Sequence, residues 1–375
     1  MAQEFDIAVI GAGIAGASVA AYLAQAGKRI ALLEMESQPG YHTTGRSAAV
    51  YAPSYGPAPI RALTRASKAF FTNPPDGFSD TPLFTPRTMM MIARADQLTA
   101  LHQLEGEVKT DTVRIVDEAG LRALNPLVRS NYAQAALVDT AGQDIEVSAL
   151  HQGFLRQFKE AGGILITNAE AQKITQSDPW QIETRHSDIR AEILVNAAGA
   201  WAGMIGQGAG AEHIGLTPKR RTALIIAAPD KMAIGDYPIT IDVQEQFYLK
   251  PDAGRLLVSP ADATPSDPCD AQPDELDVAI CVDRIETAFD LQVRRIENKW
   301  AGLRSFVPDG APVAGFSGSV NGFYWLAGQG GYGIQSAPAL AEVAAAQILG
   351  RQIPAYITDQ GFDPETVGPS RLGQV

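Results

Sequence analysis

The chain has 375 residues, of which 46% are hydrophobic, and its 42 acidic against 30 basic side chains give a formal net charge of −12. This length predicts two domains, since single cores stop growing at roughly 250–300 residues. The negative charge argues against nucleic acid, whose phosphates select basic surfaces, and favours a small-molecule partner. Two cysteines, Cys269 and Cys281, exclude a disulfide framework, and no Cys or His cluster has metal-ligand spacing, so we expect no metal site.

The expected cellular location follows from two kinds of segment that we do not find in this sequence, a signal peptide and a membrane-spanning helix. The first apolar run has no basic flank and no cleavage site of the signal-peptide kind, and no run reaches the roughly 18 apolar residues of a spanning helix. With so few cysteines a reducing compartment fits best. We therefore expect a cytoplasmic protein, with peripheral contact to the inner membrane as an open alternative.

The strongest pattern lies in the first 34 residues. Residues 6–10 are an apolar run too short for a helix and predict a buried parallel strand. The turn from Gly11 to Gly16 leads into an alanine-rich helix over 15–26, and a second strand over 29–33 ends at Glu34. In such a turn the glycines permit tight folding, close approach of a pyrophosphate and helix–strand packing, and the acid binds ribose hydroxyls. The alternatives are a purely structural turn and a solvated carboxylate.

Periodicity and turn residues predict the remaining elements in chain order. Helices are expected at 61–71, 118–124, 149–161, 275–289 and 335–349, and strands at 89–92, 164–167, 180–183, 191–195, 224–226, 247–250, 256–258 and 323–327. The strands at 224–226, 247–250 and 256–258 have no helices between them, which predicts an antiparallel sheet distinct from the first, doubly wound part. The methionine run at 89–91 is typical of core filling.

Several short segments occur in a fixed order along the chain. They are Gly45-Arg46-Ser47-Ala48-Ala49, Val195 to Trp201 (V-N-A-A-G-A-W), Trp300 to Arg304 (W-x-G-L-R), Asp309 to Gly315 (D-G-x-P-V-x-G) and the glycine loop 328–333 before the last helix. Together with the first motif they resemble FAD-dependent oxidoreductases of the D-amino-acid oxidase and glycine oxidase group, from Ile7 to about Leu349. Residues 39–49 are most similar to bacterial D-arginine dehydrogenases.

This resemblance implies an α/β fold in which a Rossmann-like FAD-binding domain (1–84, 145–216 and 310–375) joins a second, antiparallel-sheet (α+β) substrate domain (85–144 and 217–309). It also implies the residues that contact FAD: Gly11, Gly13, Ile14, Ala15, Gly16, Glu34, Gly45, Arg46, Ser47, Ala48, Ala171, Ala198, Gly199, Trp201, Gly330, Gly331, Tyr332, Gly333, Ile334 and Gln335. Some relatives attach flavin through a cysteine near the last glycine loop. No cysteine stands there, so we expect non-covalent FAD.

For the substrate, the resemblance implies two carboxylate-binding arginines, Arg221 and Arg304, and two hydroxyl donors, Tyr55 and Tyr248. An arginine fork suits a carboxylate, although either arginine could instead pair with a surface acid. A phenol with a pKa near 10 is better suited to orientation than to general base catalysis. The implied reaction oxidises the CH–NH₂ bond of a D-amino acid to an imino acid, which water hydrolyses to a 2-oxo acid and ammonia. A quinone or dye is the expected electron acceptor, with oxygen as the alternative.

Two positions depart from the D-arginine dehydrogenase pattern. Met89 and Val50 stand where that pattern has a glutamate and a histidine. Without the carboxylate, a buried cationic side chain would be unpaired, whereas apolar surface is favoured at about 25 cal/mol per Å². We therefore expect a preference for neutral, largely apolar D-amino acids. N-methyl amino acids, 2-hydroxy acids and a non-catalytic or tRNA-directed role are the alternatives.

Overall fold

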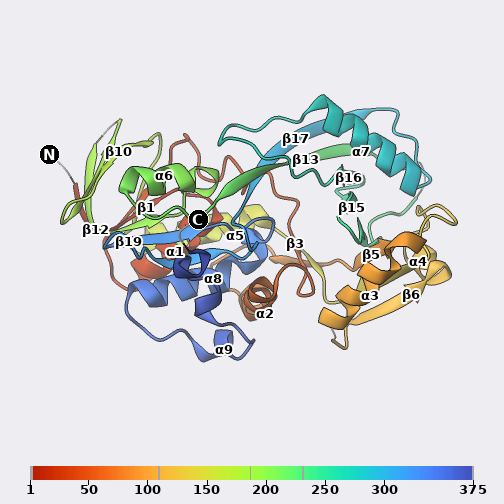
Figure 1. The fold of residues 1–375 in the computed structure, drawn as a ribbon, viewed down its shortest axis with the longest axis horizontal. Helices are drawn as coiled ribbons and strands as arrows, with labels where there is room; N and C mark the ends of the chain where they lie inside the picture. Colours follow the sequence, from red (N-terminus) through yellow and green to blue (C-terminus); the bar gives the residue numbers. More distant parts are fainter. Residues whose placement is uncertain (1–2, 109, 186, 230–231, 374–375) are drawn as a thin grey trace.

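The computed structural model describes residues 3–108, 110–185, 187–229 and 232–373. In these ranges the strands form two eight-stranded sheets and one three-stranded sheet. Figure 1 shows one large sheet toward each end of the long axis, with the long strands β13 and β17 extending away from the middle toward the α7 end. The α/β fold with a Rossmann-like domain and a second domain is confirmed.

The first sheet is the nucleotide-binding half of the molecule. Its strands, in spatial order, are β10 (Ala171–Thr175), β11 (Trp180–Thr184), β12 (Asp188–Asn196), β1 (Gln3–Ile10), β2 (Ile30–Leu33) and β9 (Ile164–Ile166), with β19 (Phe323–Ala327) also on β12 and β18 (Val313–Phe316) on β19. β12, β1, β2, β9 and β19 pair in parallel, whereas β10, β11 and β18 pair antiparallel.

Helices cover both faces of this sheet. They are α1 (Ile14–Gln25), α2 (Ala58–Thr72), α5 (Val147–Glu160), α6 (Ala202–Ala209), α8 (Gly333–Ile348), the short α9 (Ala355–Thr358) and the 3-10 turns η2 (Gly199–Trp201), η3 (Pro364–Thr366) and η4 (Pro369–Leu372). Ile7 and Val9 of β1 pack in the core under α1, α5 and α8, and Ala8 and Ile10 pack in the core on the opposite face. Burial on both faces explains why β1 is a continuous apolar run.

The second sheet lies at the other end of the molecule. Its order is β17 (Ile296–Phe306), β13 (Thr217–Ala227), β16 (Arg255–Ser259), β15 (Tyr248–Asp252), β14 (Ile239–Asp242), β5 (Met89–Ala93), β7 (Ala135–Asp139) and β6 (Val113–Asp117). The accompanying helices are η1 (Ala95–Gln97), α3 (Leu98–Glu107), α4 (Glu118–Leu124) and α7 (Glu275–Ala288). In the methionine run, Met90 packs into one core, and Met89 and Met91 pack into the other.

The expectation of a purely antiparallel second sheet is wrong at one pairing. β5 and β14 run parallel, with Met89 beside Ile239. β5 and β14 belong to two segments that are far apart in the sequence, so they are not joined by a hairpin. Without a hairpin turn, the two strands are free to pair in the parallel direction.

A small third sheet is formed where the chain passes between the two proposed domains. It consists of β3 (Val50–Tyr51), β8 (Gln143–Ile145) and β4 (Phe84–Pro86). The proposed domain boundaries after residues 84 and 144 fall inside β4 and β8, whereas those after 216 and 309 fall at the start of β13 and after the end of β17. We keep the two-domain division as a proposal.

The first prediction concerns the turn before α1. A Cβ atom on Gly16 would lie 1.8 Å from the carbonyl oxygen of Gly11, so Gly16→Ala must displace the turn from α1. We expect this variant to lose bound FAD and to have a lower melting temperature. Gly203→Ala in α6 is the matched control, because a Cβ there meets no atom within 4 Å and alanine is favoured in helices by about 1 kcal/mol.

The measurements are the ratio of FAD to protein after purification and the Tm by circular dichroism. Gly16→Ala protein with full FAD content and an unchanged Tm would show that the turn tolerates a side chain.

Candidate active site

The principal cavity has a volume of about 520 Å³ and opens where β1, β2 and β12 end. Ligands of open α/β sheets bind at this carboxyl edge. All of the expected FAD contacts line this cavity except Gly16, Gly45, Tyr332 and Gln335. Gly16 and Gly45 instead lie against backbone, where an added Cβ would meet Gly11 O and Gly40 O.

The first glycine turn brings the N-terminus of α1 to the cavity. Gly11 has φ +98° and a Cβ there would lie 2.5 Å from Ala197 O, so the turn crosses the end of β12 closely. Gly13, Ile14 and Ala15 line the cavity. Because backbone N–H groups and the helix dipole favour anions at a helix N-terminus, this turn suits a pyrophosphate.

Glu34 lies at the end of β2 with 7% exposure. Its Oε2 accepts a hydrogen bond from Ala12 N at 3.0 Å, and its Oε1 accepts one from Glu36 N at 3.0 Å. Burial raises the pKa of Glu34, and these two N–H donors partly offset the shift. The carboxylate is therefore anchored at the cavity wall; its contact with ribose stays a prediction.

The second glycine loop brings another helix N-terminus, that of α8, to the same cavity. Gly330 has φ +56° and packs on Phe306, and a Cβ on Gly331 would lie 2.7 Å from Nη1 of Arg304. Glycines are needed here because the loop lies directly on β17. The side-chain atoms Ser305 Oγ and Gln329 Nε2 are buried without a hydrogen-bond partner among the described residues, although both residues line the cavity. Such polar atoms call for a polar ligand, which FAD satisfies.

A smaller chamber of about 70 Å³ adjoins the main cavity. The residues that line both spaces are Ser47, Ala48, Arg221, Tyr248, Arg304 and Gly331. The residues predicted for the substrate all line the chamber: Val50, Tyr55, Met89, Arg221, Tyr248 and Arg304. The structure therefore brings the six together beside the cofactor cavity, with the arginines at the junction.

Strand pairing explains how the arginines meet. β13 and β17 are antiparallel neighbours in which Arg221 lies opposite Gly302 and Lys219 lies opposite Arg304. Residues two apart on a strand share a face, so both arginines lie on the face toward the cavity. The opposite wall is built in the same way, because Met89 lies beside Ile239 in β14 and Ile241 lies opposite Tyr248.

The positive charges of the two guanidinium groups are not balanced by ion pairs with carboxylates among the described residues. Arg221 Nε donates to Asp262 O at 2.8 Å, and no carboxylate forms an ion pair with Arg221 or Arg304 in the part of the chain that the structure describes. Burial and the neighbouring Arg304 lower the pKa of Arg221. Burial also lowers the pKa of Arg304, but Coulombic interactions with Tyr248, Tyr55 and Glu245 outweigh it, so the net direction is upward. Two desolvated cations favour an anionic ligand.

The tyrosines supply hydroxyl groups to the same space. Burial raises the pKa of Tyr55 well above its usual value, so its phenol stays protonated near neutral pH. Its ring contacts that of Tyr332 at a centroid distance of 5.1 Å. Tyr332 itself lines neither space in the described structure, so its link to the chamber is this ring contact with Tyr55.

Some site residues were not predicted from the sequence, or were predicted with another role. Gln335 was expected at FAD but lines the chamber, where its Oε1 accepts from Ala52 N at 2.8 Å. Arg46 lines the main cavity, yet its guanidinium donates to Ala271 O and Ala301 O, each at 2.9 Å. The residues missed include His42, Thr43, Thr44, Ile239, Ile241 and Glu245. The polar loop after Glu34 pointed to the first three, and alternation along β14 would have found the isoleucines; no signal marks Glu245.

With this geometry the chain can be placed in a family. It belongs to the FAD-dependent oxidoreductases of the DAO family, whose model matches residues 6–347, and FAD is its cofactor. Among the described residues, no helix combines the length and apolar character needed to cross a bilayer.

Particular relatives are similar at low identity. Mouse mitochondrial dimethylglycine dehydrogenase is 24% identical over 69% of this chain, which spans 31% of that protein, and the uncharacterized oxidoreductase YurR of Bacillus subtilis is 24% identical over 92% of this chain and 95% of its own length. The crystal structure of glycine oxidase from Geobacillus kaustophilus has a TM-score of 0.84 at 19% identity and covers 98% of this chain and 99% of that one. L-α-glycerophosphate oxidase from Mycoplasma pneumoniae, with FAD bound, has a TM-score of 0.82 at 16% identity and covers 92% and 95%. The structural likeness shows the fold.

The second prediction concerns how FAD is held. Cys269 is exposed, Cys281 is buried, and neither lines the main cavity or the chamber. We expect mild acid precipitation of the purified protein to release FAD into the supernatant, measured by its absorbance and chromatography. A yellow pellet that keeps its flavin after washing would demonstrate a covalent bond.

Proposed function

We propose that the protein is an FAD-dependent dehydrogenase that oxidises the CH–NH₂ bond of a D-amino acid with a neutral, largely apolar side chain. The product is an imino acid, which water hydrolyses to a 2-oxo acid and ammonia. The observation that carries this proposal is the pair of guanidinium groups, Arg221 and Arg304, at the junction of the cofactor cavity and the chamber without an ion-pair partner among the described residues.

The residues of the chamber have distinct roles in this proposal. Arg304 and Arg221 bind the substrate carboxylate through planar, charge-assisted hydrogen bonds, which fixes the Cα atom relative to the cofactor cavity. The hydroxyls of Tyr55 and Tyr248 orient the amino group. Met89 and the other apolar side chains exclude water. When bound, FAD supplies the two-electron acceptor for conversion of the C–N bond to C=N.

The side-chain preference follows from the apolar wall of the chamber. Val50, Met89, Ile239 and Ile241 line it. These groups bury apolar surface at about 25 cal/mol per Å² but cannot pair with a guanidinium or an ammonium group, and the one carboxylate among the described residues of the chamber, Glu245, shares the space with two arginines. A neutral side chain is therefore favoured over a basic one.

A second candidate is an N-methylated amino acid of small size. The chamber holds only about 70 Å³, and dimethylglycine dehydrogenase and glycine oxidase, whose names specify small substrates, are among the similar proteins. The same arginines would bind its carboxylate. A tRNA-directed role is disfavoured by the net charge of −12.

The third prediction tests the arginines. Arg304→Lys and Arg221→Met should each lower kcat/KM by about 10²-fold and raise KM, because loss of a desolvated charge pair costs roughly 2–4 kcal/mol. Arg255→Met is the matched control: Arg255 belongs to the same sheet, but its half-exposed side chain pairs with Glu297 outside the chamber. FAD content should stay normal in all three variants. Wild-type kinetics in both Arg304→Lys and Arg221→Met would remove these residues from the site.

The fourth prediction tests the substrate. Under anaerobic conditions, neutral D-amino acids should bleach the flavin absorbance faster than D-arginine, D-lysine, the L-enantiomers and N-methylglycine, and a dye or quinone should reoxidise the flavin faster than oxygen. Met89→Glu should raise kcat/KM for D-lysine relative to D-leucine, because it adds a second carboxylate to the lining of the chamber, which already includes Glu245, and places it on the apolar wall.

The panel distinguishes the candidates. D-arginine as the best wild-type substrate would contradict the apolar preference, and N-methylglycine as the best substrate would select the second candidate.

A further inference from the structure

We propose that Glu245 determines which substrate charge the chamber accepts. Because of its carboxylate, the chamber with two arginines binds a ligand with one carboxylate and disfavours a ligand with two. The proposal rests on the proposed function, since it takes the arginines as the site of a substrate carboxylate. It concerns the selectivity of that site toward acidic side chains, which neither Met89 nor Val50 controls.

Glu245 lies in the turn between β14 and β15 and lines the same chamber as Arg221 and Arg304. It is half-buried, and its carboxylate has no hydrogen bond or ion pair with any residue that the structure describes. Its charge nevertheless reaches the chamber, because after burial it is the largest cause that raises the pKa of Tyr55 and of Tyr332. An unpaired carboxylate and two unpaired guanidiniums therefore share one small space.

The balance of these charges decides which ligand fits. Two guanidiniums alone would match a dicarboxylate. Glu245 reduces the net charge of the three groups to +1, which matches the single carboxylate of a substrate with a neutral amine and a neutral side chain. In a chamber of about 70 Å³, a second carboxylate would have Glu245 as a near neighbour, and like charges at such an interface are unfavourable.

The backbone of Glu245 provides a separate observation. Its φ is +56°, in the left-handed region that favours glycine, and its N–H donates to Asp242 O at 2.8 Å in a tight turn. A glutamate at such a position is strained. Strain of this kind gathers at functional sites, where the surrounding structure holds the residue in place.

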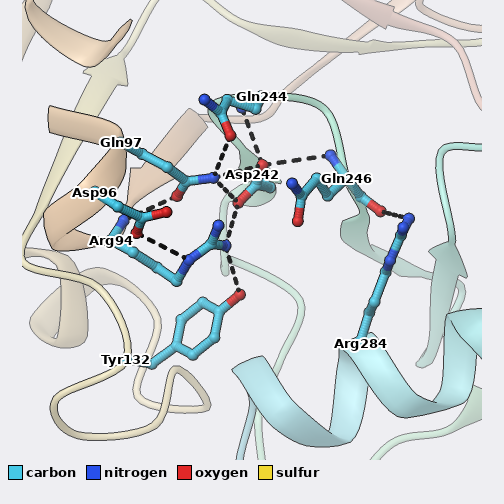
Figure 2. Close-up of polar contacts among 8 residues, drawn as sticks. All are labelled: Arg94, Asp96, Gln97, Tyr132, Asp242, Gln244, Gln246 and Arg284. Atoms are coloured by element: carbon cyan, nitrogen blue, oxygen red, sulfur yellow. Dashed lines mark hydrogen bonds and ion pairs between the residues drawn. The ribbon is translucent and has the colours of Figure 1, made fainter. Parts of the chain in front are cut away.

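The group that holds this turn is centred on the buried Asp242 (Figure 2). Asp242 Oδ1 accepts from the backbone N–H of Gln244 at 3.0 Å and of Gln246 at 3.3 Å, on the two sides of Glu245. Gln97 Nε2 donates to Asp242 Oδ2 at 3.0 Å, and Arg94 Nη1 pairs with the same oxygen at 3.2 Å. The carboxylate of Asp242 thus ties the turn to the start of η1.

A second arginine fixes the other end of the turn. Arg284, from α7, donates through Nη1 to Gln246 O at 2.6 Å (Figure 2). The same nitrogen donates to Pro260 O at 2.7 Å. Gln97 also donates to Gln244 Oε1 at 3.2 Å. Each neighbour of Glu245 in the turn is therefore engaged by residues outside the chamber, whereas the Glu245 carboxylate is not. The turn presents a fixed charge to the chamber.

The test uses ligands that differ by one carboxylate. FAD-loaded wild type and Glu245→Gln are titrated with butyrate and with succinate, and binding is followed by the change in flavin absorbance. We expect Glu245→Gln to strengthen succinate binding relative to butyrate by about 10-fold or more, because the repulsion is removed while both arginines remain. The kcat/KM ratio of D-glutamate to D-glutamine should rise in parallel.

Three variants serve as controls. Asp252→Asn removes one charge from the end of β15 in the same sheet, outside both spaces, and should leave the succinate-to-butyrate ratio unchanged. Glu245→Asp keeps the charge and should keep most of the selectivity. Glu245→Gly should lose the selectivity and raise the Tm, since glycine relieves the left-handed backbone.

The outcomes separate this proposal from the proposed function. If butyrate and succinate both bind but their ratio is the same in wild type and Glu245→Gln, the role of Glu245 is overturned and the carboxylate site stands. If neither acid perturbs the flavin in either protein, the carboxylate site fails, and the role of Glu245 fails with it.

Discussion

Two guanidinium groups lining one enclosed space are the constraint on which the active-site region depends. Desolvating Arg221 and Arg304 costs free energy that no ion pair within the described residues offsets. The surrounding structure has to hold them in place: the long pairing of β13 with β17 sets their spacing, Gly302 stands opposite Arg221, and Gly331 leaves room for Arg304. An anionic ligand would supply the charge partner that these arginines lack, which is why we propose the junction of the two spaces as the position of a substrate carboxylate.

The same region joins the two large sheets. Thr43 Oγ1 donates to Leu303 O at 2.7 Å, Trp300 Nε1 donates to Arg46 O at 3.0 Å, and the Arg46 guanidinium donates to Ala301 O at 2.9 Å. The loop from the nucleotide-binding half is thus fastened along β17, the strand that carries Arg304. The loop that carries Thr43 and Arg46 lines the cofactor cavity and is also bonded to β17, which carries Arg304 into the chamber. The position of the cavity relative to the chamber is therefore fixed by these contacts.

Local patterns predicted much of this arrangement. The strand–glycine turn–helix at the N-terminus and the strand at Met89 follow from periodicities over a few residues, which sequence displays directly. The parallel pairing of β5 with β14 does not, because it joins residues about 150 positions apart and depends on packing. Glu245 was missed for a related reason: a left-handed turn is usually marked in sequence by glycine or asparagine, and two of the residues that hold this turn, Gln97 and Arg284, are distant from it in sequence.

The selectivity that we propose for the chamber has two components, which act over different distances. Contact with Met89 and Val50 is short-ranged and rewards apolar area, so it discriminates by the surface of the side chain. The field of Glu245 acts over a longer distance and discriminates by sign, so it opposes an acidic side chain and partly compensates a basic one. Because these residues come from β5, β3 and the β14–β15 turn, a change in one need not move the others. The proposed order of preference, neutral over basic over acidic side chains, follows from the sum of the two components and requires neither to be strong by itself.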